Sequence, residues 1–145
     1  MGEQKVKTMD GGTEANRPKV APVSAKKMKR KVPRGKIYIQ STYNNTIITV
    51  TDPTGQVLGW GSAGLTGFKG SKKSTPYAAQ RTMEDTMGRL KNLGLSEVDV
   101  FVKGVGSGRD SAIRALQSAG VAVISIKDIT PTRHGGVRPK KVRRV

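Results

Sequence analysis

Apolar and polar residues alternate through residues 36–63, a pattern typical of strands that bury one face. Ile37 and Ile39 mark a first strand, and the β-branched run at residues 47–50 marks a second. A third strand follows over residues 56–63. The alternation therefore predicts a three-stranded meander.

Two short polar segments join these strands. Tyr43-Asn44-Asn45 predicts a hairpin loop, because asparagine tolerates left-handed backbone dihedrals. Asp52-Pro53-Thr54-Gly55 has Asp, Pro and Gly at the positions that a type I turn favours. Both connections are short enough to keep neighbouring strands antiparallel.

Helical spacing replaces alternation after residue 75. Thr75 has the residue type of an N-cap, and Pro76 suits the first helical position. Gly94 predicts the stop of this helix. Its apolar stripe is formed by Ala79, Met83, Met87 and Leu90.

The last part of the pattern predicts a strand–helix–strand unit. Valines alternate over residues 98–102, a helix with Ile113 and Leu116 ends at Gly120, and residues 121–129 form a fifth strand. That strand is almost continuously apolar, which predicts cover on both faces. A connection of this length makes the two strands parallel. The sequence thus predicts an α/β domain with a mixed five-stranded sheet.

Charge divides the 145 residues into three parts. Nine basic and no acidic residues fall within 17–36, six basic and no acidic residues within 130–145, and the rest is nearly neutral. We predict a basic extension over 1–35, an α/β domain over 36–129 and a basic tail over 130–145, with both arms disordered when free.

The overall composition indicates an anionic partner. A net charge of +17 and a pI of about 10.7 favour nucleic acid over a membrane surface. The absence of cysteine excludes disulfides and cysteine-bound zinc. The N-terminus is polar and no apolar run reaches the roughly twenty residues of a membrane span, so we expect a soluble cytoplasmic protein.

The stretch Gly64–Pro76 has the composition of a phosphate-binding loop. Its three glycines allow backbone N–H groups to approach an anion, and its three lysines supply positive charge. Phe68 adds a flat apolar side chain that could stack on a base or pack on protein. The alternative is a solvated loop that its lysines keep soluble.

A second glycine-rich loop, Gly104–Arg109, lies between the fourth strand and the second helix. It does not complete a dinucleotide fingerprint, because the third glycine would fall at Arg109. Gly70-Ser71-Lys72 likewise does not complete a P-loop, so we expect no nucleotide cofactor. A helix N-terminus with an arginine still suits a phosphate of a larger ligand.

Catalytic chemistry has little support. His134, the only histidine, lies in the basic tail without a carboxylate nearby in sequence. A two-metal nuclease needs clustered carboxylates, whereas Asp52, Asp99 and Asp128 lie on or near different strands. We expect no enzyme, metal or cofactor. A metal-dependent nuclease and a generic cationic DNA-binding protein remain the alternatives.

Four ordered motifs strongly resemble the small-subunit ribosomal protein S-eleven family, of bacterial type. They are Asn44-Asn45-Thr46, the run from Gly67 to Gln80, the run from Lys103 to Leu116, and the end from Thr130 through His134 to Lys141. The match covers residues 35–145. The resemblance implies a three-layer α/β/α, ribonuclease-H-like fold without the nuclease's active site.

The same resemblance implies a structural role on the platform of the small subunit, bridging several helices of its 16S rRNA. Messenger RNA and neighbouring platform proteins would lie close by, with no membrane contact and no homo-oligomer. The candidate rRNA contacts are Asn44, Asn45, Phe68, Lys69, Gly70, Ser71, Lys72, Lys73, Ser74, Lys103, Gly104, Gly106, Gly108, Arg109, Arg133, His134, Arg138, Lys140, Lys141, Arg143 and Arg144. From the N-terminal arm, the candidates are Lys26, Lys27, Lys29, Arg30, Lys31 and Arg34.

The sequence departs from the family pattern in three places. Val105 and Ser107 replace usual prolines, which predicts a more flexible second loop. Gly135 replaces the usual asparagine after His134, and Arg133 replaces a proline and adds charge to the tail.

Overall fold

Five strands form one mixed sheet in the computed structural model, which describes residues 31–141. The spatial order is β3-β2-β1-β4-β5. Strand β1 pairs antiparallel with β2 and parallel with β4, β2 pairs antiparallel with β3, and β4 pairs parallel with β5. The strands are β1 (Arg34–Ser41), β2 (Thr46–Thr51), β3 (Val57–Ser62), β4 (Glu97–Lys103) and β5 (Ala122–Asp128). The predicted meander, the parallel strand pair and the α/β class are confirmed.

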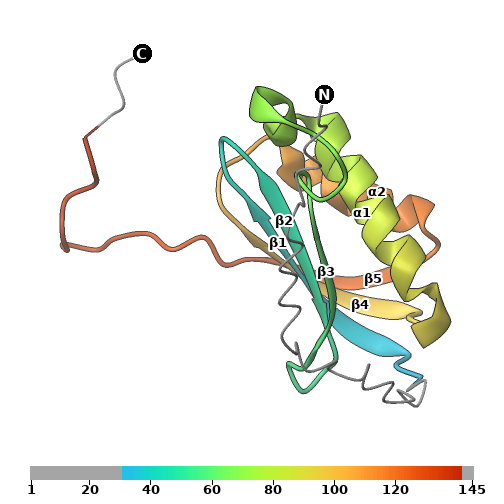
Figure 1. The fold of residues 1–145 in the computed structure, drawn as a ribbon. Coiled ribbons are helices and arrows are strands. Elements are labelled where there is room, and N and C mark those ends of the chain that lie inside the picture. Colours follow the sequence, from blue (N-terminus) through green and yellow to red (C-terminus); the bar gives the residue numbers. More distant parts are fainter. Residues whose placement is uncertain (1–30, 142–145) are drawn as a thin grey trace, which may run out of the picture.

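Two helices pack side by side on the same face of this sheet (Figure 1). Helix α1 (Pro76–Leu90) contacts β2 and β3, and α2 (Gly108–Ser118) contacts β1 and β5. Within residues 31–141 the domain therefore has two layers, whereas the family resemblance implied helices on both faces.

The core lies between the helices and one face of the sheet. The alternating side chains of β1 and β4, among them Ile37, Ile39, Val98 and Val100, are fully buried there. The predicted apolar stripe of α1 faces them, and Met83 is fully buried. Burial of this size stabilises the fold by about 1.5–3 kcal/mol for each large aliphatic side chain.

Helix α1 begins as its sequence predicts, but it ends at Leu90, four residues before the predicted stop at Gly94. The Thr75 side chain accepts a hydrogen bond from the backbone N–H of Ala78 at 3.3 Å, and Pro76 occupies the first turn. A short 3-10 segment, η2 (Lys91–Leu93), follows the helix. It ends at Gly94, whose φ of +68° is left-handed.

Glycine lets α1 approach strand β3 closely. A Cβ atom on Gly61 would lie 2.1 Å from the Thr86 hydroxyl oxygen, and one on Gly59 would lie 2.9 Å from the Leu90 side chain. The glycines of β3 therefore face the helix. Trp60, between them, points to the opposite face of the sheet.

Strand β5 differs from its prediction. It lies at the edge of the sheet, and Ile124 and Ile126 are 49% and 59% exposed. The prediction of cover on both faces was wrong, because a continuous apolar run does not distinguish an inner strand from an edge strand that the helices cover only in part.

The C-terminal tail leaves the domain after β5 and runs away from it (Figure 1). Among residues 31–141, no helix is long and apolar enough to cross a bilayer. The predicted domain boundaries stay a prediction.

Candidate nucleic-acid interface

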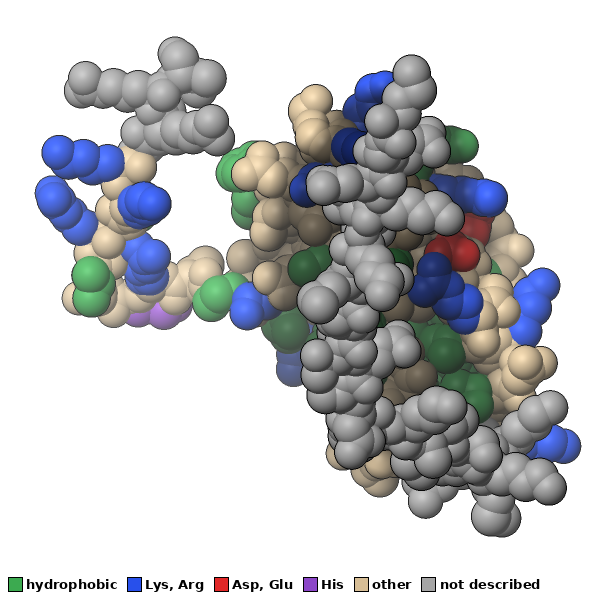
Figure 2. All heavy atoms as spheres, in the orientation of Figure 1, with side chains coloured by type: hydrophobic (Ala, Val, Ile, Leu, Met, Phe, Trp, Pro, Cys, Tyr) green, Lys and Arg blue, Asp and Glu red, His purple; other side chains and the backbone are tan. Residues whose placement is uncertain are grey.

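The candidate contact segments converge at one end of the domain. Strands β1, β4 and β5 end there and β2 begins there, and both helices start there. The hairpin loop, the loop before α1, the loop before α2 and the start of the tail are therefore neighbours, although they are up to 90 residues apart in sequence. Figure 2 shows Lys and Arg side chains at this end and along the tail.

The loop before α1 has a regular backbone that positions its lysines. A short 3-10 helix, η1 (Gly70–Ser74), carries Lys72 and Lys73. The Thr75 hydroxyl donates to the Lys72 carbonyl oxygen at 2.8 Å. Lys69 and Lys72 are exposed, and the ion pairs among residues 31–141 do not involve any of the three lysines. Their charges are thus available to an anion.

Phe68 packs against protein. Its ring meets the ring of Tyr77, in the first turn of α1, edge to face with centroids 5.9 Å apart. The Phe68 N–H donates to the Ala63 carbonyl oxygen at 3.1 Å. This contact anchors the loop to α1, and stacking of Phe68 on a base stays a prediction.

The loop before α2 is seated on the hairpin between β1 and β2. The Gly106 N–H donates to the Ser41 carbonyl oxygen at 3.1 Å, and the Ser107 hydroxyl donates to the Ser74 carbonyl oxygen at 2.9 Å. A Cβ atom on Gly106 would lie 2.4 Å from the Thr42 carbonyl oxygen. These hydrogen bonds hold the loop against the end of β1 and tie it to the loop before α1, while its greater flexibility stays a prediction.

Arg109 holds the second loop to the root of the tail. Its guanidinium donates to the Gly104 carbonyl oxygen at 2.8 Å and to Asp128 Oδ2 at 2.6 Å. The Thr130 hydroxyl accepts from the Gly104 N–H at 3.0 Å and donates to Asp128 Oδ1 at 2.6 Å. Two of the five N–H donors of Arg109 are therefore engaged within the domain, and its contact with RNA stays a prediction.

Hydrogen bonds hold Asp128 in its ionised form. The Thr130 hydroxyl and backbone N–H, together with the Arg109 guanidinium, lower the pKa of Asp128 from 3.8 to about 2. Because the folded-state pKa is below the unfolded value, these bonds stabilise the fold fully above about pH 4, and their contribution is lost as the pH falls towards 2.

Asp128→Asn should therefore lose less stability than the wild type between about pH 4 and pH 2. Chemical denaturation at a series of pH values measures this difference. Parallel curves for the two proteins over that interval would show that Asp128 does not hold this junction.

The hairpin loop presents two asparagines differently. The side-chain oxygen of Asn45 accepts from the Thr46 N–H at 2.9 Å, so this side chain shapes the turn. The Asn44 side chain is exposed. The Thr42 hydroxyl accepts from the N–H of Asn45 at 3.1 Å and closes the loop.

The described part of the tail is exposed along its length. Arg133 donates to the Val137 carbonyl oxygen at 3.2 Å, and His134 Nε2 lies 3.3 Å from the Thr132 hydroxyl. Arg138, Lys140 and Lys141 are exposed. The tail therefore extends a line of cations beyond the domain.

The remaining candidates are separated or not described. Lys103 is exposed at the end of β4, whereas Arg34 lies at the other end of the sheet, 3.1 Å from Asp99. Lys31 is exposed near that end. Lys26, Lys27, Lys29, Arg30, Arg143 and Arg144 lie outside the described residues.

The carboxylates of the nuclease alternative do not meet. Asp99 accepts from the Ser125 hydroxyl at 2.7 Å and from Arg34, which lower its pKa. Asp128 lies at the opposite end of the sheet. Among residues 31–141, no three acidic, histidine or cysteine side chains are grouped as metal ligands.

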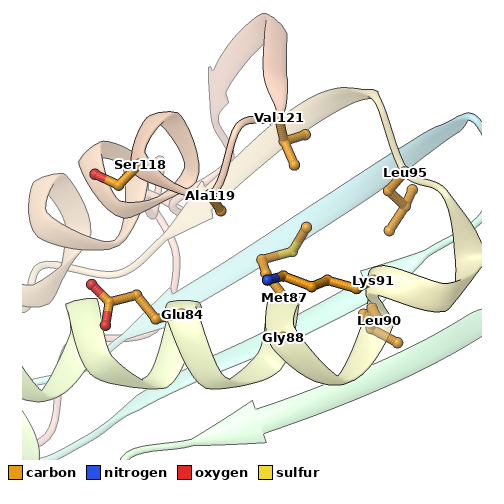
Figure 3. Close-up of a pocket in the computed structure, with 9 residues that line it drawn as sticks. All are labelled: Glu84, Met87, Gly88, Leu90, Lys91, Leu95, Ser118, Ala119 and Val121. Atoms are coloured by element: carbon orange, nitrogen blue, oxygen red, sulfur yellow. The ribbon is translucent and has the colours of Figure 1, made fainter.

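A cleft of about 380 Å³ opens at the far end of the helices from the basic loops (Figure 3). Met87 and Val121 point into it, from α1 and from the segment after α2. Glu84 and Lys91 are the charged residues of its lining. Five of its nine lining residues are apolar and Lys91 is the one basic residue of the lining, so the cleft does not continue the basic surface.

Sequence reasoning missed the residues that hold the interface together. Ser41, Asp128 and Thr130 hydrogen-bond to residues of the second loop that are 19 or more positions away in sequence. Only Thr130, two residues after Asp128, could have indicated a local hydrogen-bonded turn, because it also bonds to that neighbour.

Taken together, an α/β domain with ordered basic loops at one end and a cationic tail defines a nucleic-acid-binding protein. Residues 35–144 match the family described as Ribosomal protein S11. The chain therefore belongs to the ribosomal protein S11 family.

Curated relatives agree with this family. The chain is 55% identical over 127 residues to the small ribosomal subunit protein uS11 of Borreliella burgdorferi, strain ZS7. The match covers 88% of this chain and 98% of the relative. The proteins of the same name from Borreliella afzelii and Borrelia garinii subsp. bavariensis match with the same identity and the same coverage.

Proposed function

We propose that this protein is a structural, rRNA-binding component of the small ribosomal subunit in the cytoplasm. Family membership supports this role, since the relatives carry the name of a small-subunit protein. The observation that carries the proposal is the convergence of three loops and the tail at one end of the domain, with the loop lysines unpaired within residues 31–141. Its partners are rRNA and neighbouring ribosomal proteins.

In finer detail, we infer that the protein bridges several helices of 16S rRNA at the platform, near the messenger RNA and without forming a homo-oligomer. Lysines on separate loops and a tail that leaves the domain can reach different segments of a folded RNA. Phosphate contacts then provide affinity, and the fixed spacing of the loops selects the shape of the RNA.

Binding of the full-length protein to a platform fragment of 16S rRNA tests this function. At moderate salt, the protein should bind the fragment more tightly than an unrelated RNA of equal length, and its affinity should fall steeply as salt rises. Equal affinity for the two RNAs would contradict the proposal. Equal affinity for duplex DNA and for rRNA would instead favour the generic DNA-binding alternative.

The nuclease alternative receives no support from the arrangement of the carboxylates. Asp99 and Asp128 are engaged with Arg34 and Arg109, at opposite ends of the sheet. RNA cleavage that requires a divalent metal and is lost in Asp99→Asn or Asp128→Asn would restore that alternative.

A further inference from the structure

The face of the sheet opposite the helices carries one continuous row of side chains across all five strands. The register pairs Trp60 with Thr49, Thr49 with Tyr38, Tyr38 with Phe101, and Phe101 with Lys127. Directly paired residues point to the same face, and the buried neighbours Ile37, Ile39, Val100 and Val102 point to the helices. The row therefore lies on the open face.

Aromatic residues are concentrated in this row. The chain has six aromatic residues, and three of them are Trp60, Tyr38 and Phe101. Tyr38 and Phe101 stack with their ring centroids 5.1 Å apart. Such a cross-strand pair stabilises a sheet, which accounts for these two rings without any ligand.

A cross-strand aromatic pair does not explain the presence of Trp60 on this face. Its side chain is 56% exposed, and no aromatic ring among residues 31–141 packs against it. Trp60 on β3 and Tyr38 on β1 are separated by strand β2. The usual spacing between neighbouring strands places their backbones about 10 Å apart. Thr49, whose side chain is shorter than both rings, lies between them in the register.

The charge of this face selects an anionic partner. Lys36, Lys103 and Lys127 belong to the open face, by alternation with the buried residues of their strands or by register. The two acids of this face are Glu97 and Asp99, and Asp99 forms an ion pair with Arg34 at 3.1 Å. A second copy of the chain has a net charge of +17, and segment 17–30 has six basic and no acidic residues, so neither supplies the negative charge that this face favours.

We propose that the row from Trp60 to Lys127 binds an unpaired stretch of RNA, whose bases stack on Trp60 and the Tyr38–Phe101 pair. Lys103 and Lys127 then contact its phosphates, together with Lys36, whose ammonium also donates to the Pro53 carbonyl oxygen at 2.9 Å. Flat apolar surface combined with cations matches the chemistry of exposed bases on a phosphate backbone. This inference rests on the proposed rRNA-binding function and adds a second surface to it.

The fluorescence of Trp60 tests the proposal directly, because it is the only tryptophan of the chain. An eight-nucleotide oligoadenylate should quench the emission of the full-length protein. Inorganic polyphosphate of equal charge should bind without quenching, since it has no bases. Equal quenching by both probes would overturn the proposal.

Matched variants separate stacking from charge and from folding. Trp60→Leu should weaken oligoadenylate binding about tenfold, the size expected for loss of one stacking ring, whereas Trp60→Phe keeps a flat ring and should retain most of the affinity. Because Trp60 is exposed, both variants should keep the wild-type thermal midpoint. Unchanged affinity in Trp60→Leu would overturn the proposal.

Binding to a platform fragment of rRNA distinguishes failure of the stacking proposal from failure of the proposed rRNA-binding function. If the wild type binds that fragment selectively and Trp60→Leu binds every RNA as tightly as the wild type does, the stacking proposal is wrong and the proposed function stands. If the wild type itself shows no selectivity, the proposed function falls and the stacking proposal falls with it.

Discussion

Gly104→Val should lower the free energy of unfolding by about 3 kcal/mol or more, the sum expected from backbone strain and overpacking. Gly104 has a φ of +101°, which a β-branched residue rarely adopts. A Cβ atom at this position would lie 2.1 Å from the Ser41 carbonyl oxygen. Backbone cannot move aside as a side chain can, so the loop must leave its seat on β1.

Chemical denaturation measures this loss, with Gly136→Val as the matched control. A Cβ atom on Gly136 would meet nothing within 4 Å, so that variant should stay within about 0.5 kcal/mol of the wild type. If Gly104→Val cannot be purified in a folded form, Gly104→Ala places the same Cβ atom against Ser41. If both Gly104 variants were as stable as the wild type, the close contact of this loop with the Ser41 carbonyl oxygen would be contradicted.

The combined variant Lys69→Ala, Lys72→Ala and Lys73→Ala should bind a platform fragment of rRNA about 10- to 100-fold more weakly at moderate salt. Each lysine that neutralises a phosphate adds close to one unit to the slope of log affinity against log salt. The slope should therefore flatten by two to three units. Stability should change little, because η1 has no buried residues.

A charge-matched control replaces Arg81, Arg89 and Lys91 by alanine. It removes the same charge from exposed positions of α1 and η2, where Arg81 and Arg89 already pair with Glu84 and Asp85. Its affinity and salt slope should remain near those of the wild type. Equal losses in the two triple variants would mean that net charge, and not the loop, determines binding.

Local patterns predicted most of the secondary structure, because periodicity and caps depend on nearby residues. The stripe of α1 and its Thr75 cap appear where the sequence places them, whereas Gly94 ends the 3-10 segment η2 and not α1 itself. The exposure of β5 could not be predicted, since it depends on strand order. Ile124 and Ile126 would be equally apolar in an inner strand.

The candidate site was predicted as residue types but not as contacts. The family resemblance made Gly104, Gly106 and Gly108 candidate rRNA contacts, whereas Gly104 and Gly106 approach the protein backbone at Ser41 and Thr42. Arg109 suggested a free cation, yet Asp128 engages it from 19 residues away. Neither partner can be identified without the fold.

The aromatic row shows the same limit. Tyr38 lies between Ile37 and Ile39, and Phe101 between Val100 and Val102, so alternation alone places both rings away from the core. That Trp60 joins them depends on the register of β1, β2 and β3. The sequence of one strand predicts on which face of the sheet a side chain lies. The alignment of side chains into a row depends on how the strands pair.

Crosslinking of the protein to rRNA within the assembled small subunit would show directly whether the loop end and the tail bind the RNA. We expect crosslinks from Lys69, Lys72 and Lys73 and from tail residues 133–141, and none from Lys91 in the cleft at the other end of the helices. Crosslinks from Lys91 with none from the loop lysines would contradict this expectation.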